Sequence, residues 1–164
     1  MRGAMAALLL LTAGAYGTAQ AHDHPFAVEG DAGWTAAERK SGHDEVLTMA
    51  RIRQLAAINA GLTELARRDA TACRWMNQII GPETLGRQVA AFDTHPAIKG
   101  VIEAERMTVR EYLLALRAVS ETAISVHGAE HRVPVPAAAS ASNVSFYRQH
   151  RVEIEQLLDA RDPC

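Results

Sequence analysis

The chain of 164 residues has few aromatic residues, only two cysteines and a net charge close to zero. With 17 basic and 19 acidic residues, it lacks the basic excess of a nucleic-acid-binding protein. It also lacks a G-x-S-x-G elbow, a C-x-x-C-H motif and a glycine-rich phosphate loop, so nothing in it indicates a serine hydrolase, a c-type cytochrome or a nucleotide-binding enzyme. No helix is basic and amphipathic enough to suggest a membrane surface.

The first 21 residues have the features of a secretory signal peptide. Arg2 supplies a short positive region, residues 6–13 are apolar, and Ala19-Gln20-Ala21 has the A-x-A pattern of a cleavage site. The apolar stretch is shorter than the roughly 20 residues that span a bilayer. We therefore expect export, in a bacterium to the periplasm, and a mature single-domain chain that begins at His22 and has no integral membrane segment.

Cys73 and Cys164 are the only cysteines in the chain. Neither stands directly after Ala21, where a bacterial lipoprotein would carry its lipidated cysteine. In an oxidising compartment two lone cysteines favour one disulfide, which would close a loop of about 90 residues and stabilise the fold by roughly 4 kcal/mol. The alternative is a buried Cys73 thiol and a free Cys164.

Apolar residues recur at helical spacing through most of the mature chain, and no segment alternates as a strand would. We expect a polar, extended arm over residues 22–42, anchored by Trp34, followed by a bundle domain over residues 43–164. The predicted fold class is all-α, an irregular helical bundle of four longer helices and one or two short ones. The expected helices cover residues 44–67, 70–80, 82–92, 96–102, 108–128 and 142–158.

Four residues mark the starts of these helices. Asp69 and Ser142 are predicted N-caps, and Pro82 suits a first helical turn. Thr108 and Glu111 fit the T-x-x-E pattern of a capping box, in which each side chain bonds the backbone of the other residue. The helix that begins at Thr108 has apolar residues at steps of three or four, so we expect it to be the central buried helix.

Three short motifs carry a resemblance. Thr94-His95-Pro96 is an HP turn, residues 108–112 read T-x-R-E-Y, and residues 143–146 read N-V-x-F. In this pattern, over about residues 46–158, the chain resembles a loose group of small, exported, all-helical bacterial proteins of unknown function. The motifs are caps, turns and core positions, so the resemblance implies a helical fold and implies no catalytic residues.

Cleavage after Ala21 would place His22-Asp23-His24 at the new N-terminus. The α-amine, the Asp23 and His24 amides and the His24 imidazole can then surround Cu(II) or Ni(II) in a square plane, a geometry that both ions favour with nitrogen ligands. His22 offers a second route, through its own amine and imidazole. The alternative is that these are arbitrary polar residues at the start of an exported chain.

His127-Gly128-Ala129-Glu130-His131 matches H-x-x-E-H, the motif of one metalloprotease class. Zinc hydrolysis would need both imidazoles on one helical face, Glu130 as the base and a distant third ligand. Gly128 inside the motif predicts that the helix ends there, which weighs against the site. A surface metal site from His127 and His131 alone is the other metal hypothesis.

The remaining histidines have structural interpretations. We expect His95 to cap or pack at the HP turn, His150 to be a core or interfacial residue, and His43 to be solvated. The leading prediction is therefore a small exported helical protein that binds an unidentified protein or small ligand without catalysis. Copper or nickel binding is the first alternative, and a zinc hydrolase is the weaker one.

Overall fold

A computed structural model of the chain describes residues 33–78, 83–131 and 139–158. Within these ranges the chain forms seven helices and no strand, which confirms the all-α fold class. Three helices are long, and each of the other four has nine residues. The helices are α2 (Ala36–Asp44), α3 (Met49–Arg68), α4 (Ala70–Gln78), α5 (Leu85–Asp93), α6 (Pro96–Ala104), α7 (Val109–His131) and α8 (Ala141–Leu158). None of these helices is long and apolar enough to cross a membrane.

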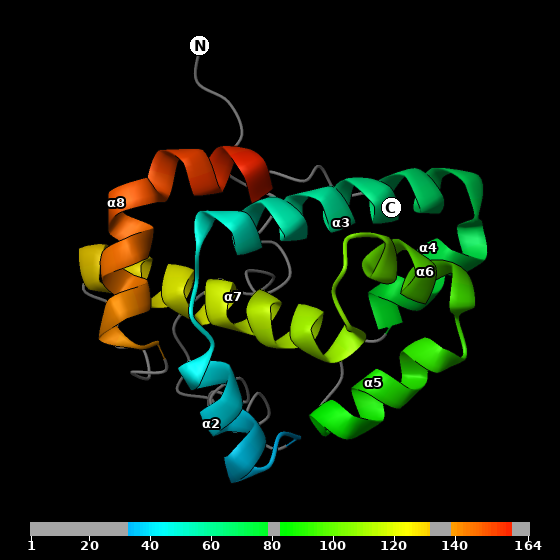
Figure 1. The fold of residues 1–164 in the computed structure, drawn as a ribbon, viewed down its shortest axis with the longest axis horizontal. Coiled ribbons are helices and arrows are strands. Elements are labelled where there is room, and N and C mark those ends of the chain that lie inside the picture. Colours follow the sequence, from blue (N-terminus) through cyan, green and yellow to red (C-terminus); the bar gives the residue numbers. More distant parts are fainter. Residues whose placement is uncertain (1–32, 79–82, 132–138, 159–164) are drawn as a thin grey trace, which may run out of the picture.

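The helix α7 is the central element, as the sequence predicted. It contacts α2, α3, α5, α6 and α8, and Figure 1 shows it running through the middle of the molecule between them. Its Ala115, Val119 and Val126 side chains are almost fully buried in the main core. Around it, α3 and α8 close one side, and α5 and α6 lie toward the other end.

The capping box at the start of α7 is present. The Thr108 hydroxyl accepts a bond from the Glu111 amide at 3.2 Å, and the Glu111 carboxylate accepts one from the Thr108 amide at 2.7 Å. The predicted end of this helix was wrong, because α7 continues through Gly128 to His131. Glycine inside a helix costs only about 1 kcal/mol, and burial of the surrounding turn outweighs that cost.

The arm expected over residues 22–42 is helical in its second half. Thr35 and Glu38 form a second capping box, with the same T-x-x-E spacing as at Thr108, and α2 follows from it. The two glycines and the polar composition of residues 22–42 had favoured an extended chain over this local signal. Trp34 is buried, as predicted for the anchor of this segment.

Three other predicted helix starts lie a few residues away from the observed ones. The residues between α2 and α3 are extended, and Thr48 caps α3 through the Arg51 amide. Thr84 caps α5, whereas Pro82 lies outside the described residues. At α8 the Ser140 hydroxyl accepts a bond from the Asn143 amide, so Ser140 replaces Ser142 as the capping side chain.

Asn143 fixes α8 to the segment before α3. Its amide oxygen accepts the Leu47 N–H at 3.0 Å, and its amide nitrogen donates to the Glu45 carbonyl at 2.8 Å. The side chain is 2% exposed, and both ends of the amide are satisfied. The first residue of the N-V-x-F motif is therefore a buried clamp that positions the last helix.

Candidate functional site

A cluster of ionisable side chains joins the end of α7 to the middle of α8. His127 and Glu130 are one turn apart on α7, and Tyr147, Arg151 and Glu155 follow one another at steps of four on α8. Steps of three and four place side chains on one helix face. We call these five residues the α7–α8 cluster.

Arg151 is the centre of the α7–α8 cluster. Its Nη1 lies 2.7 and 2.9 Å from the two Glu130 carboxylate oxygens, and its Nε lies 2.7 Å from Glu155. These two carboxylates, Glu155 first, raise the pKa of the guanidinium. One cation therefore ties α7 to α8 and bridges two acidic side chains.

The contact with Arg151 also determines the tautomer of His127. The Arg151 Nη2 is 3.2 Å from the His127 Nδ1, and a guanidinium can only donate. His127 therefore accepts at Nδ1 and carries its proton on Nε2, which lies 3.6 Å from a Glu155 oxygen. The imidazole is largely covered, with 16% of its side chain exposed.

Tyr147 is the fifth member of the cluster and packs against the His127 imidazole. Its ring meets that of His127 edge to face, with centroids 6.4 Å apart, and its hydroxyl is 3.4 Å from Glu155. Burial first, and the negative charge of Glu155 second, raise the pKa of Tyr147 to about 12. The phenol is consequently protonated at every physiological pH.

The H-x-x-E-H residues are divided between two environments. His127 and Glu130 both bond Arg151, whereas His131 is exposed at the last position of α7. Among the residues that the structure describes, no three His, Cys, Asp or Glu side chains are placed to hold a metal. Arg151 engages both His127, a predicted zinc ligand, and Glu130, the predicted base, and the zinc-hydrolase hypothesis and the surface metal site from His127 and His131 both stay predictions.

Two other predicted sites extend outside the described residues. His22, Asp23 and His24 all lie there, so the copper site stays a prediction. Cys73 is half-buried on α4. Cys164 lies outside the described ranges, and its pairing with Cys73 also stays a prediction.

The other histidines contact aromatic rings or face solvent. His95 precedes Pro96 at the start of α6 without a side-chain cap bond, and its ring stacks on Trp75 with centroids 4.1 Å apart. His150 lies against Phe146 at 4.9 Å and is half-buried. His43 is exposed in the last turn of α2.

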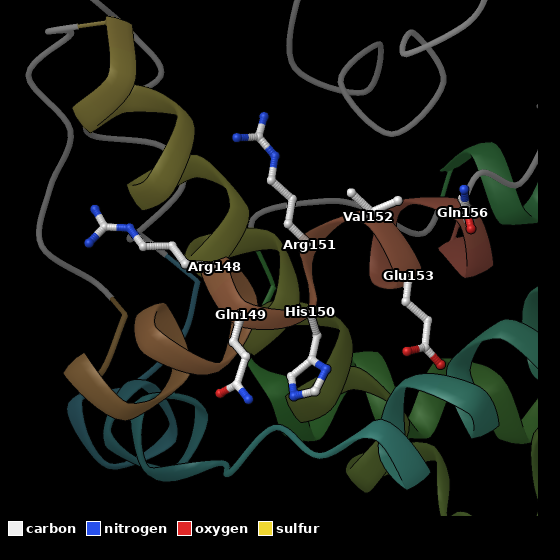
Figure 2. Close-up of a pocket in the computed structure, with 7 residues that line it drawn as sticks. All are labelled: Arg148, Gln149, His150, Arg151, Val152, Glu153 and Gln156. Atoms are coloured by element: carbon white, nitrogen blue, oxygen red, sulfur yellow. The ribbon is translucent and has the colours of Figure 1, made fainter.

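The outer side of α8 carries a hollow of about 330 Å³, which we call the α8 hollow. Figure 1 shows that α8 bends near its middle, and Figure 2 shows Arg148, Arg151 and Val152 projecting from one side of it. All of the lining residues belong to this one helix, so the hollow is an open surface and not an enclosed pocket. They are Arg148, Gln149, His150, Arg151, Val152, Glu153 and Gln156.

Neither the α7–α8 cluster nor the α8 hollow was predicted from the sequence. The steps of four from Tyr147 to Arg151 to Glu155 were visible in the sequence and could have indicated a shared face. Their partners on α7 depend on how the two helices pack, which no local pattern encodes.

No known protein family, curated protein or solved structure matches this chain.

Proposed function

We propose that this chain is a small exported helical protein that acts without catalysis and binds another macromolecule through the outer side of α8. The observation that carries the proposal is Val152, whose side chain is exposed to 68% within the α8 hollow. Protein interfaces have an apolar core and a polar rim, and Val152 with its polar neighbours has this composition.

The helix that presents Val152 is held at two points. The Asn143 clamp fixes its first turn to the segment before α3, and Arg151 fixes its middle to α7. A surface on a fixed element loses little conformational entropy when it binds. Because small ligands are usually bound in concave sites that cover most of their surface, an open hollow favours a macromolecular partner.

The side chains around Val152 supply polar contacts. Arg148 is exposed and makes no ion pair with the described residues, and Gln149 and Gln156 are exposed beside it. Arginine is enriched in interfaces because its planar guanidinium stacks and forms several hydrogen bonds at once. Arg148 therefore favours a partner with carboxylate groups next to an apolar contact.

Site-specific photo-crosslinking in the exporting cell tests this proposal. A crosslinking residue at position 152 is expected to give one discrete adduct, which Arg148→Glu abolishes. Val46 provides a matched control, because it is also a valine and is exposed to 65% in the segment between α2 and α3. If position 152 gives no adduct, or the same adducts as position 46, the assignment of this surface is wrong.

Copper or nickel binding is a second proposal, supported by the His22-Asp23-His24 sequence after the predicted cleavage site. One equivalent of Cu(II) is expected to give a square-planar nitrogen absorption band that His24→Ala abolishes. His131→Ala removes an exposed histidine elsewhere and should leave the band unchanged. If His131→Ala weakens binding and His24→Ala does not, the metal lies on α7, as the H-x-x-E-H hypothesis requires.

A further inference from the structure

Among the described residues, α2 is held to the bundle chiefly by one large apolar side chain. The buried residues from Gly33 to Asp44 are Gly33, Trp34 and Gly42. Trp34 packs with Leu85 and Leu114 in a small cluster, which the partly buried Val89 and Leu113 join to the main core. Figure 1 shows α2 beside α7, with the start of α5 nearby.

Two polar contacts lie at the rim of this small cluster. The Arg117 guanidinium sits over the Trp34 ring, 4.5 Å from its centroid. The Glu38 carboxylate accepts a hydrogen bond of 3.2 Å from the Gly86 amide in the first turn of α5. A carboxylate is favoured there, because the amides at the start of a helix carry partial positive charge.

The segment that follows α2 provides a defined pivot. Glu45 has an extended backbone, and the Asn143 side chain holds the Glu45 carbonyl and the Leu47 amide. Residues before Glu45 can therefore move while α3 and α8 keep their contacts. Undocking of α2 would separate Trp34 from Leu85 and Leu114 and would remove none of the buried residues of the main core cluster.

We propose that residues 33–44 form a displaceable strap that covers a helix-binding groove between α5 and α7. The strap opens as a unit about the Glu45 pivot while the rest of the bundle stays folded. The groove is formed by α5 and α7 and not by α8, so this inference does not depend on the proposed function.

The contacts of the strap define the kind of partner that the groove takes. In the groove, Leu85 and Leu114 can contact an apolar side chain of the partner. The Arg117 cation can lie over the face of an aromatic ring, and the Gly86 N–H can donate to a carboxylate. A matching partner is a short segment with an aromatic residue just before the start of a helix and Asp or Glu in the first helical turn, as in Trp34 and Glu38. An anchored helix in a groove is a common mode of peptide recognition.

The two tryptophans allow strap opening to be measured separately from global unfolding. In Trp75→Phe the remaining fluorescence comes from Trp34 in the strap, and in Trp34→Phe it comes from Trp75 on α4. We expect the Trp34 signal to change at a lower urea concentration than both the Trp75 signal and the helical circular dichroism. Coincident transitions would show that α2 unfolds with the bundle and would overturn the strap.

Hydrogen exchange of the unaltered protein gives the same comparison if either variant fails to fold. The amides of α2 should exchange faster than those of α7 under native conditions, by about tenfold or more if opening is local. Equal protection of the two helices would overturn the strap without any substitution in the protein.

A synthetic peptide of residues 33–46 tests the groove itself. It should bind the full-length Trp34→Ala variant, whose own strap has lost its anchor, about tenfold or more tightly than it binds the wild-type protein. The same peptide with Trp34→Ala is the matched control and should not bind. If the native peptide binds no better than this control, the groove is not a helix-binding site.

Discussion

At the residue scale, Gly61 combines a cost and a requirement. Glycine lowers the helix propensity in the middle of α3. In the structure a Cβ at this position would lie 2.6 Å from the Cγ1 of Val101, so α3 and α6 approach each other closely because residue 61 has no side chain. The absence of a side chain is here a packing requirement.

Gly61→Ala is expected to lower the free energy of unfolding by up to about 2 kcal/mol, because an overpacking cost of about 1–3 kcal/mol is offset by a helix-propensity gain of roughly 1 kcal/mol. Urea denaturation measures the change. Val101→Ala in the same chain should restore part of the loss. Gly100→Ala is the control, since no atom lies within 4 Å of its Cβ position, and it should stabilise the protein or leave it unchanged.

Tyr147 predicts a loss of stability at alkaline pH. Its pKa is about 12 in the folded chain against a reference of 10.0, so the folded state disfavours the ionised phenol. The stabilisation is complete below pH 10 and is lost as the pH rises toward 12. The free energy of unfolding, measured in urea at several pH values, should therefore fall less steeply over this range in Tyr147→Phe than in the wild type.

The buried Tyr112 allows a check on that result. Burial also raises its pKa to about 12, so some alkaline loss should remain in Tyr147→Phe. Tyr112→Phe combined with Tyr147→Phe should give the flattest profile. If Tyr147→Phe has the same profile as the wild type, Tyr147 ionises as readily in the folded chain as in the unfolded one.

At the element scale, the helices were predictable where a local signal marks them. The Thr108 capping box and Pro96 at the first turn of α6 are patterns of a few adjacent residues, and both helices begin where these signals indicate. The Thr35 capping box carried the same information and was overlooked. The contacts of Arg151 with Glu130 and of Asn143 with Glu45 join segments far apart in the chain, and local spacing cannot reveal them.

Asn143→Ala tests the clamp that positions α8. The substitution would leave the Leu47 amide and the Glu45 carbonyl without their partner in a buried position, at a cost of about 2–4 kcal/mol. Thermal and urea unfolding measure the loss. Ser145→Ala, at an exposed position of the same helix, should change the stability by less than about 0.5 kcal/mol. Equal effects of the two substitutions would show that the clamp contributes nothing.

At the scale of the whole molecule, the described residues form one bundle around α7, and the surfaces proposed for binding lie on α8 and between α5 and α7. The predicted bundle and its central helix agree with the structure, whereas the proposed contact surfaces could not be found from the sequence. Val152 became a candidate only once its exposure was known, because apolar residues on a helix are normally interpreted as core. Both functional proposals also need the chain to be exported.

The intact mass of the protein recovered from the exported fraction tests that requirement most directly. The account predicts a mature chain that begins at His22, with a deficit of two hydrogens if Cys73 and Cys164 are paired. This result would place the His22-Asp23-His24 sequence at a free N-terminus and the α8 surface in an oxidising compartment. A mass that includes the first 21 residues, or a protein confined to the cytoplasm, would contradict export and both functional proposals with it.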